Sequence, residues 1–508
     1  MLADAGVDRV ACAILQRDTP AVCRVVATIA PMETRNLIGG RWVGANDGTT
    51  FAVQDPATGA ELAQVPAGGG AEARAAIEAA AAALPDWRRR TAADRGRRLR
   101  RLGELMLERK EDLAKFLTAE QGKPLAEARG EIAYAASFVD WAAEEGKRVH
   151  GETVPAGHPD KRILVLRQPV GVTAAITPWN FPSAMITRKL GPSLAAGCTI
   201  VIKPAEQTPL SALALGELCQ EAEIPTGVVN IVTGDAEAIG DELLTNAHVR
   251  KLSFTGSTEV GRILMRKAAH NITRLSLELG GHAPFLVFAD ADLDAAVSGA
   301  MASKYRNMGQ TCVSPNRFLV HEDVYDAFAS RLTTAVAGLR IGRGAEDGVH
   351  IGPLIDAAAM AKVEQHVEDA VDRGARIRCG GKRVKVPGCV DRFYAPTVLD
   401  DVRPDMLVSR EETFGPVSPL RRFRTDVEAL EMANDSPFGL AAYFYTRDAA
   451  RLMRVAEGLE FGIIGANDGA PSIAQAPFGG MKQSGFGREG GSYVMHDYLE
   501  LKYVSWSL

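Results

Sequence analysis

The sequence predicts an α/β protein with two doubly wound parallel sheets and an additional β-strand arm. The first observation is that short apolar runs alternate with helical patterns from about residue 170 to residue 269, as in a parallel sheet that helices cover on both faces. The second is a further alternating series that begins at Asp292 and extends to about Pro471. The third is the C-terminal run Tyr498 to Val504, whose apolar and polar residues alternate with the period of a strand.

Length and composition limit the classes of protein. The 508 residues are too many for one hydrophobic core, so two domains with an appendage are expected. Apolar residues make up 46% and charged residues 24%, as in an ordinary globular protein. The formal net charge of −5 disfavours a general nucleic-acid binder, and no apolar run reaches the roughly 18 residues that a membrane helix needs. We therefore expect neither nucleic acid nor a membrane among the partners.

The cysteines and histidines show no grouped spacing. Seven cysteines, an odd number, stand at positions 12, 23, 198, 219, 312, 379 and 389. This distribution is typical of a reducing compartment, so we predict a cytoplasmic protein without a disulfide framework. The nine histidines are dispersed, and no Cys-x-x-Cys or His-x-x-x-His spacing offers metal ligands. We predict no metal site.

Residues 1–31 differ from the rest of the chain. They are rich in Ala and Val, carry Asp4, Asp8 and Asp18, and lack an uninterrupted apolar core behind a basic start. They therefore make a poor signal peptide. Our hypothesis is that Met32 is the true start or that residues 1–31 form a disordered tail.

Short strands and then three helices are expected next. Gly39 to Val43 and Phe51 to Val53 have the composition of short strands around a turn. Helical patterns follow over residues 71–84, 92–120 and 125–146. Eight arginines form a dense basic run near the start of the second helix. Acidic residues follow within three turns, so the pattern favours a solvated helix face over a nucleic-acid patch.

The chain continues as alternating strands and helices. Strands are predicted over residues 162–167, 170–176, 199–202, 228–232 and 251–254, and helices over 183–196, 209–222, 236–244 and 258–269. Parallel sheets bind ligands beyond the carboxyl ends of their strands, so the loops after these strands are candidate ligand sites. We place the active site in the cleft between this domain and the second α/β domain.

Two side chains are candidates for chemistry. Cys312 lies in a turn-forming run between the helical pattern 293–303 and the β-rich run 318–320, so we expect it in a connection that can present a nucleophile. A purely hydrophobic buried cysteine is the alternative. Glu278 lies in an apolar segment, where burial would raise its pKa toward neutrality, as a general base requires. The alternative for Glu278 is a salt-bridged structural carboxylate.

These motifs carry a resemblance to a known family. Gly309-Gln310-Thr311-Cys312, together with Leu277-Glu278-Leu279-Gly280-Gly281, resembles the aldehyde dehydrogenase superfamily. The longer run Lys304 to Cys312 resembles its succinate-semialdehyde dehydrogenase branch. The resemblance extends from about Asn36 to the C-terminus.

The resemblance implies a division of the chain into three parts. A Rossmann-like dinucleotide-binding domain takes residues 32–149 and 170–285, and a catalytic domain takes residues 286–477. An oligomerisation arm of residues 150–169 and 478–508 pairs the two predicted end strands and adds to a neighbouring subunit's sheet. A homotetramer, arranged as a dimer of dimers, is the expected assembly.

The resemblance also implies a mechanism. The Cys312 thiolate attacks an aldehyde carbon, and the oxyanion is stabilised by the Cys312 backbone N–H and by the amide of Asn180, which the surrounding prolines hold in a stiff backbone. Hydride passes to nicotinamide, and Glu278 activates the water that hydrolyses the thioester. Relatives that transfer the acyl group to coenzyme A generally lack a carboxylate at position 278, so its presence favours hydrolysis.

Three segments are expected to hold the cofactor. Gly256 follows a strand and precedes a helix whose N-terminus can attract phosphate. Lys203 can donate to a ribose, and Glu206 can accept from both ribose hydroxyls but would repel a 2′-phosphate, so NAD is expected, with NADP as the alternative. A surface loop carboxylate is the other interpretation of Glu206. The resemblance places Glu412 at the nicotinamide ribose with Phe414 near the ring, and it adds four further contacts, namely Trp179, Ala205, Ser257 and Leu279.

Three residues concern the substrate. Arg188, Arg306 and Ser472 match the residues that bind the distal carboxylate in succinate-semialdehyde dehydrogenases. Two guanidinium groups and a hydroxyl make a strong carboxylate clamp, so an ω-carboxylated aldehyde of about four carbons is expected. Interdomain salt bridges are the alternative use of the two arginines.

Some features leave the substrate open. Ser314 stands where many relatives have a second cysteine, so no inhibitory disulfide can form in this loop. Gly281-His282-Ala283-Pro284 occurs in relatives that act on 2-oxoglutarate semialdehyde. Glutarate or 2-oxoglutarate semialdehyde, or a broad range of aldehydes, are therefore alternatives. A thiol hydrolase without redox chemistry and a noncatalytic homologue are disfavoured, because the cofactor motifs, Cys312 and Glu278 are all present.

Overall fold

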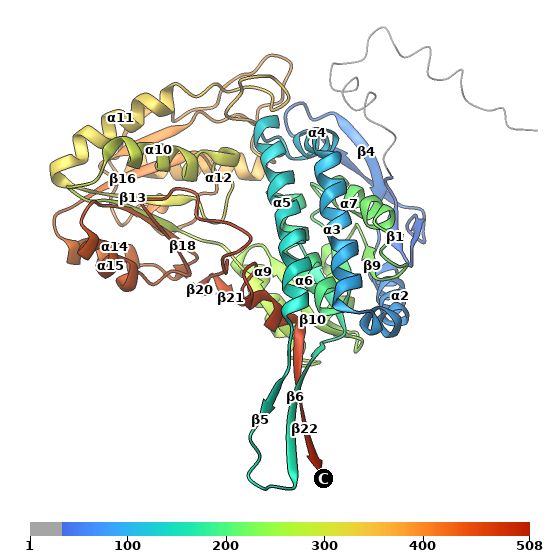
Figure 1. Ribbon diagram of the computed structural model, residues 1–508. Coiled ribbons are helices and arrows are strands. Elements are labelled where there is room, and N and C mark those ends of the chain that lie inside the picture. The colour runs from blue at the N-terminus through green and yellow to red at the C-terminus, as the bar shows by residue number, and fades with distance from the viewer. Residues whose placement is uncertain (1–32) are drawn as a thin grey trace, which may run out of the picture.

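The computed structural model describes residues 33–508, and Figure 1 shows two sheet-containing lobes with a β arm that projects below them. The predicted fold class, with two parallel-sheet units and a strand arm, is confirmed. The predictions for residues 1–31 lie outside the described residues. Within those residues, no helix has both the length and the apolar character needed to cross a bilayer. The five described cysteines are free thiols.

The first sheet has eight strands in the order β2-β1-β9-β8-β7-β10-β11-β21. They are β1 (Asn36–Ile38), β2 (Arg41–Val43), β7 (Val172–Ile176), β8 (Thr199–Lys203), β9 (Val229–Ile231), β10 (Val249–Thr255), β11 (Arg274–Glu278) and β21 (Gly485–Phe486). The five central strands are parallel, and every residue of β8 is buried, as the apolar runs predicted. β1 and β21 add antiparallel edges to β9 and β11, which the sequence did not predict.

Eight helices of the first lobe surround this sheet. They are α2 (Gly70–Arg89), α3 (Ala92–Glu108), α4 (Lys110–Gln121), α5 (Leu125–Glu145), α6 (Pro182–Ala196), α7 (Leu210–Glu221), α8 (Ala236–Thr245) and α9 (Thr258–Ala268), with the 3₁₀ turn η1 (Gly146–Arg148) after α5. The single helix predicted over residues 92–120 is wrong, because the backbone leaves the helical conformation at Arg109 (φ −101°, ψ 18°) and starts again as α4. The prediction that the preceding helix ends at Leu84 is also wrong, since α2 continues through Pro85.

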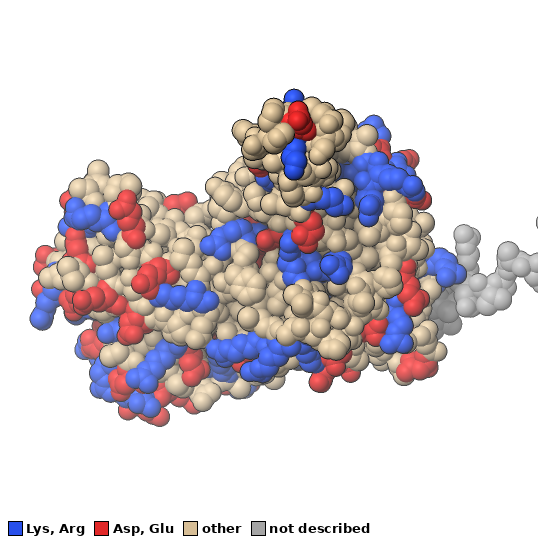
Figure 2. All heavy atoms as spheres, turned by 90° about the horizontal axis from the view of Figure 1, so that it is seen from below, with Lys and Arg blue, Asp and Glu red and all other residues tan. Residues whose placement is uncertain are grey.

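The basic run at the start of α3 is paired with carboxylates. Thr91 caps the helix by accepting from the Asp94 N–H at 3.2 Å, and the Asp94 carboxylate binds Arg90 at 2.8 Å. Arg101 binds Glu108 at 2.7 Å. Figure 2 shows positive and negative side chains interspersed over the underside of the molecule. These contacts are those of a solvated helix face, the interpretation that the sequence favoured.

The second lobe contains a seven-stranded sheet in the order β14-β15-β16-β13-β12-β18-β19. Its strands are β12 (Ala283–Val287), β13 (Pro315–His321), β14 (Arg376–Cys379), β15 (Thr397–Asp400), β16 (Val417–Phe423), β18 (Ala441–Tyr445) and β19 (Ile463–Ala466). Its helices are α10 (Leu293–Lys304), α11 (Tyr325–Ala337), α12 (Ala357–Asp372), α13 (Leu407–Arg410), α14 (Asp426–Asn434) and α15 (Ala449–Gly458). All neighbouring strands are parallel except the β14–β15 pair.

The elements outside the two large sheets, their helices and the arm are short. They are the hairpin β3 (Thr50–Gln54) and β4 (Glu61–Pro66), the pair β17 (Phe438–Gly439) and β20 (Met481–Lys482), and the 3₁₀ turns η2 (Arg306–Gly309), η3 (Glu322–Val324) and η4 (Tyr493–Tyr498).

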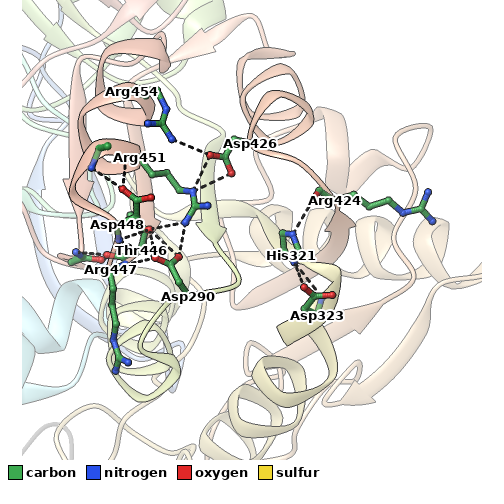
Figure 3. Close-up of polar contacts among 12 residues, drawn as sticks. Asp290, His321, Asp323, Arg424, Asp426, Thr446, Arg447, Asp448, Arg451 and Arg454 are labelled. Carbon is green, nitrogen blue, oxygen red and sulfur yellow. Dashed lines mark hydrogen bonds and ion pairs between the residues drawn. The ribbon is translucent and has the colours of Figure 1, made fainter.

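A polar cluster fixes one end of the second sheet (Figure 3). Asp290, just beyond β12, accepts from the Thr446 hydroxyl at 2.9 Å and from the Asp448 backbone N–H at 2.9 Å. Arg451 of α15 donates to Asp290 at 2.8 Å and to Asp426 of α14 at 2.9 Å. The cluster therefore joins β12 to the starts of α14 and α15.

The arm consists of β5 (Glu152–Val154), β6 (Lys161–Pro169) and β22 (Leu499–Ser507). β22 pairs antiparallel with β6, with Leu501 opposite Arg167 and Trp506 opposite Arg162, so the predicted pairing of these two segments is confirmed. Leu501 and Trp506 are 69% and 58% exposed. The arm therefore carries large apolar side chains that the described chain does not cover.

Replacement of Phe285 by Ala tests the core of the second lobe. The Phe285 side chain is fully buried and its ring lies 5.1 Å from that of Phe318 and 5.2 Å from that of Tyr445. Removing it should lower the free energy of unfolding of this lobe by about 3–5 kcal/mol, measured by chemical denaturation. The control Leu107→Ala removes a side chain that is 52% exposed and should change stability by less than about 0.5 kcal/mol. Equal effects of the two substitutions would contradict the assigned core.

Candidate active site

Four residues connect the two sheets. β11 ends at Glu278 and β12 begins at Ala283, so the carboxyl end of the first sheet meets the amino end of the second. A Cβ on Gly281 would collide with the Cys312 carbonyl oxygen, and a Cβ on Gly280 would lie 2.8 Å from the Glu412 carboxylate. Only glycine allows the Cys312 loop and Glu412 to approach this connection so closely.

The segment before Cys312 turns sharply. Asn307 and Met308 have φ values of 51° and 56°, and Gly309 has a φ of 73°. A Cβ on Gly309 would collide with the Gly415 carbonyl oxygen, so the loop packs against the segment that carries Glu412. Cys312 follows this turn, is partly exposed and precedes β13. The structure thus places the thiol in a connection between elements.

Asn180 is held against the same loop. It follows β7, and its side-chain nitrogen donates to the Gln310 carbonyl at 3.0 Å, two residues before Cys312. Its side-chain oxygen accepts from the Phe181 N–H at 3.1 Å. The Asn180 carbonyl accepts from the Asn307 side chain at 3.0 Å. These contacts orient the amide, and the second hydrogen of its nitrogen is left for a ligand.

Buried charges on α5 and beside it support Asn180. The Lys123 ammonium donates to the Asn180 carbonyl at 2.7 Å and binds Glu131 at 2.6 Å. Glu131 also accepts from the Ser183 N–H at 3.0 Å, at the start of α6. Glu127 accepts from the Asn307 N–H at 2.7 Å. The sequence reasoning missed this network, which braces the Asn180 turn and the Cys312 loop against one helix.

Glu278 is buried at the end of β11, and both of its carboxylate oxygens are without a hydrogen-bond partner among residues 33–508. Burial is the main cause that raises the pKa of Glu278 well above its usual value, and the nearby Glu489 raises it further. Within that described part of the chain, no ion pair to Glu278 is present, so the structural salt-bridge interpretation has no support.

A buried ion pair lies beside Glu278. The Lys189 ammonium donates to Glu489 at 2.6 Å and to the Thr255 hydroxyl at 2.6 Å. No motif identified Glu489 in the sequence, because it lies near the C-terminus in a glycine-rich run far from the other motifs.

The Cys312 thiol is held neutral in the protein without ligands. Burial raises the pKa of Cys312 to about 12, Glu412 and Glu278 add to this effect, and Arg188 opposes it. A neighbouring positive charge or a base that accepts the proton is therefore needed to form the thiolate at neutral pH.

The predicted cofactor residues lie along the carboxyl edge of the first sheet. Lys203 ends β8, and its ammonium binds the partly exposed Glu206, while the buried Ala205 lies between them. Ser257 caps α9 by accepting from the Val260 N–H at 3.2 Å. Gly256 precedes it, where a Cβ would collide with the Phe254 ring, so packing as well as phosphate access requires glycine there.

The remaining cofactor candidates lie where the lobes meet. The Trp179 and Phe414 rings are edge to face, with centroids 5.5 Å apart. Leu279 packs against α9, where a Cβ on Gly261 would lie 2.7 Å from it. Glu412 accepts from the Gly281 N–H at 3.0 Å through one oxygen, and burial raises its pKa to about 7. No other hydrogen bond to Glu412 is present in residues 33–508, so its second oxygen suits a ribose hydroxyl, and the set fits NAD or NADP.

The two arginines of the predicted clamp have different surroundings. Arg188 is buried, donates to the Tyr134 hydroxyl, lies 3.4 Å from Glu489 and stacks over the Phe478 ring at 4.0 Å. Arg306 is partly exposed over the Phe181 ring at 5.1 Å and has no ion pair within the described chain. Ser472 is partly exposed, and no contact joins it to either arginine. The Glu489 carboxylate thus already neutralises part of the positive charge of Arg188.

Comparison with known proteins places this geometry in context. Residues 42–504 match the family described as the aldehyde dehydrogenase family. The chain is 59% identical to the glutarate-semialdehyde dehydrogenase of Pseudomonas aeruginosa over 467 residues, which cover 92% of this chain and 96% of that protein. It is 58% identical to the succinate-semialdehyde dehydrogenase (NADP+) GabD of Escherichia coli over 468 residues, which cover 92% and 96%.

A solved structure of a related protein shows the same similarity. The succinate-semialdehyde dehydrogenase from Burkholderia pseudomallei has a TM-score of 0.92 at 55% sequence identity. The similarity covers 97% of this chain and 100% of that one. The fold and most of the sequence are therefore shared along the whole matched length.

Replacement of Lys123 by Met tests the network behind Asn180. The variant leaves Glu131 buried without its charged partner, so the free energy of unfolding should fall by about 3–5 kcal/mol, measured by chemical denaturation. The control Arg129→Met removes the exposed pair between Arg129 of α5 and Glu111 of α4 and should have little effect. An unchanged stability of the Lys123 variant would show that the network is not needed to hold these segments.

Proposed function

The chain belongs to the aldehyde dehydrogenase family, and from that premise we propose that it oxidises succinate semialdehyde to succinate with NAD or NADP. The observation that carries the proposal is the convergence of Cys312, Asn180 and Glu278 at the connection between the two sheets. The two arginines near this point supply positive charge for the distal carboxylate. The family and the site together support an oxidoreductase rather than a thiol hydrolase.

In the first step the Cys312 thiol passes its proton to ionised Glu278, which releases it to solvent, and the resulting thiolate sulfur bonds to the aldehyde carbon. The carbonyl oxygen gains the negative charge, and the free hydrogen of the Asn180 amide and the Cys312 N–H stabilise it. Bound NAD or NADP supplies the hydride acceptor and would be held by Lys203, Glu206, Glu412 and the start of α9. Loss of hydride leaves an acyl group on sulfur.

The second step hydrolyses this thioester. Ionised Glu278 takes a proton from water while the water oxygen bonds to the acyl carbon, and the carbon–sulfur bond breaks to release the acid. The negative charge of Glu489, which is paired with Lys189, raises the pKa of Glu278 and so strengthens it as a base. The raised pKa of Glu278 suits this role, because a base works best when its pKa is near the working pH.

The substrate proposal rests on a shared chemical feature. Succinate and glutarate semialdehydes, named for the two bacterial relatives, both carry a carboxylate at the end away from the aldehyde. Arg306 has no ion pair within residues 33–508 and is free to bind that group, while Arg188 and Ser472 complete the set. Glutarate semialdehyde is the second candidate, because the relative at 59% identity bears that name.

Acceptance of both cofactors follows from the Lys203–Glu206 pair. A free carboxylate at Glu206 would repel a 2′-phosphate, but the Lys203 ammonium is bound to it and partly neutralises its charge. NAD is therefore the expected preference, with NADP tolerated. The E. coli relative is named for NADP+.

We propose that the protein is a cytoplasmic homo-oligomer, arranged as a dimer of dimers. Free thiols favour a reducing compartment. The uncovered apolar residues of β22 and the open edge of the arm favour addition to a neighbouring subunit. The proposed domain boundaries are 32–149 with 170–285 for the cofactor and 286–477 for catalysis. The boundary after residue 285 divides β12 (Ala283–Val287) of the second sheet, and β21 returns to the first sheet from within 478–508.

Replacement of Glu278 by Gln tests the hydrolytic step. Acylation should persist, with the Cys312 proton passing directly to solvent, so a burst of NADH equal to the number of active sites should precede a steady-state rate about 10²–10⁴-fold below that of the unaltered protein. The unaltered protein should lose rate as the pH falls through the raised pKa of Glu278, because the protonated carboxyl cannot accept a proton. Stopped-flow absorbance of NADH measures the burst, the steady-state rate and the dependence of that rate on pH. The control Glu104→Gln, at an exposed carboxylate of α3, should leave all three unchanged. A Glu278→Gln variant with full turnover would refute the assignment of Glu278 as the base.

Replacement of Arg306 by Met tests the carboxylate clamp. The ratio kcat/KM for succinate semialdehyde should fall about 10- to 100-fold, because a charged hydrogen bond is lost, whereas butyraldehyde should be oxidised as before. Arg331→Met removes an exposed pair with Asp294 and serves as the control. The same NADH assay with glutarate semialdehyde separates the two candidate substrates. An equal loss on the charged and uncharged aldehydes would remove the clamp.

A further inference from the structure

A pocket is lined by residues of the second lobe, whose helix α14 is labelled in Figure 1, and none of the residues proposed for the active site lines it. Its volume is about 550 Å³, within the range of small-molecule sites. Residues from just before β12, from β13 and β16, and from the ends of α13 and α14 form its walls. The lining includes His282, Arg317, Ser409, Arg410, Arg421 and Asp435.

The charged lining is mainly positive. Three arginines face one carboxylate, that of the exposed Asp435. This balance repels cations and excludes a divalent metal as the occupant. An anion, in contrast, would be attracted from the side of the pocket that Arg410 and Asp435 leave open.

Arg421 is the least satisfied of these arginines. It is half-buried on β16 and has no hydrogen bond or ion pair among residues 33–508. Burial lowers its pKa, and the nearby Asp435 and Glu428 charges oppose this shift without forming an ion pair with it. Its neighbour Arg422, on the other face of the strand, binds Asp326 at 3.1 Å and stacks over the Tyr325 ring at 3.5 Å. The difference between adjacent arginines points to a ligand for Arg421.

Arg317 adds a fixed positive charge. It is 5% exposed and donates to the carbonyls of His282 at 3.0 Å, Met432 at 3.0 Å and Ala433 at 2.9 Å. These carbonyls orient the guanidinium at the end of α14, but no carboxylate hydrogen-bonds to it within the described chain. Its charge therefore still contributes to the potential in the pocket.

His282 provides a second, independent observation. Its ring is 1% exposed and lines the pocket, and neither ring nitrogen has a hydrogen-bond partner in residues 33–508. Burial and the nearby Arg317 lower its pKa well below the usual value, although the Ser409 backbone near the ring, outside hydrogen-bonding geometry, opposes the shift. The ring is therefore neutral and has one N–H to donate. A buried donor without a partner is costly, and a pocket ligand would remove that cost.

We propose that this pocket binds a small phosphate-class oxyanion through Arg421, Arg317 and the N–H of His282. A tetrahedral oxyanion offers several acceptor oxygens and a double charge, which matches two guanidinium groups and a neutral donor. Free inorganic phosphate and the terminal phosphate of a small metabolite share this chemistry. The proposal does not rest on the proposed function, because none of the residues proposed for the active site lines this pocket. Its test therefore measures binding rather than turnover.

Isothermal titration calorimetry on the full chain tests the proposal. Inorganic phosphate, titrated at constant ionic strength against a sodium chloride blank, should bind saturably at one site per subunit. Arg421→Gln should weaken this binding about 10-fold or more, and the control Arg422→Gln should leave it unchanged. Glycerol 3-phosphate in the same titration separates the two sources, since tighter binding than phosphate indicates a metabolite and weaker binding indicates the free ion.

Two further measurements keep the test decisive if Arg421→Gln does not fold. Arg410 is exposed at the rim, so Arg410→Gln should fold and should weaken phosphate binding to a smaller extent. Crystals soaked in arsenate should show an anomalous peak between Arg421 and the His282 ring. No saturable heat above the chloride blank, equal affinity in the unaltered protein and Arg421→Gln, or an arsenate peak only outside the pocket would overturn the proposal.

Discussion

The close passage of backbone at Gly280 and Gly281 is the constraint on which the site depends. The chain leaves one sheet at Glu278 and enters the other at Ala283, so the distance between the base and the Cys312 loop is fixed by four residues of backbone. Any side chain at Gly281 would displace the Cys312 carbonyl, and one at Gly280 would displace Glu412. Reacting groups carried by two sheets are in this way positioned by packing of main chain rather than by flexible side chains.

Burial sets the electrostatics of this meeting point in two ways. Lys123 and Glu131 form a satisfied pair that also binds main-chain atoms, and such a pair holds structure. Cys312 is partly exposed and Glu278 is buried, and burial is the main cause that raises the pKa of each. The Glu278 oxygens have no hydrogen-bond partner among residues 33–508, so ionisation of this carboxyl is costly. Groups left in this state are responsive to any charge that a ligand brings, which is the property expected of reacting groups rather than of structural ones.

The sequence predicted the regular parts of the fold because they have a period. Apolar runs identified the parallel strands, and two-residue alternation identified β22 and its partner β6. β21 has two residues and no period, so its return to the first sheet was invisible. The break at Arg109 lies within a continuous helical pattern, where tertiary packing rather than propensity decides. Among the site residues, Cys312 and Glu278 stood in recognisable motifs, whereas Lys123, Glu127 and Glu131 look like surface charges until α5 is seen to be covered.

Glu489 connects the substrate side of the site to the hydrolytic side. It lies 3.4 Å from Arg188, binds Lys189 at 2.6 Å and raises the pKa of Glu278, although the two cations hold its own pKa below the usual value. A substrate carboxylate that takes a hydrogen bond from Arg188 competes with Glu489 for that guanidinium. The Glu489 charge is then less neutralised, and the Glu278 carboxylate becomes a stronger base. Under the proposed assignment of Arg188 to the distal carboxylate, hydrolysis of the thioester would therefore depend on that anion, a coupling that an uncharged aldehyde could not use.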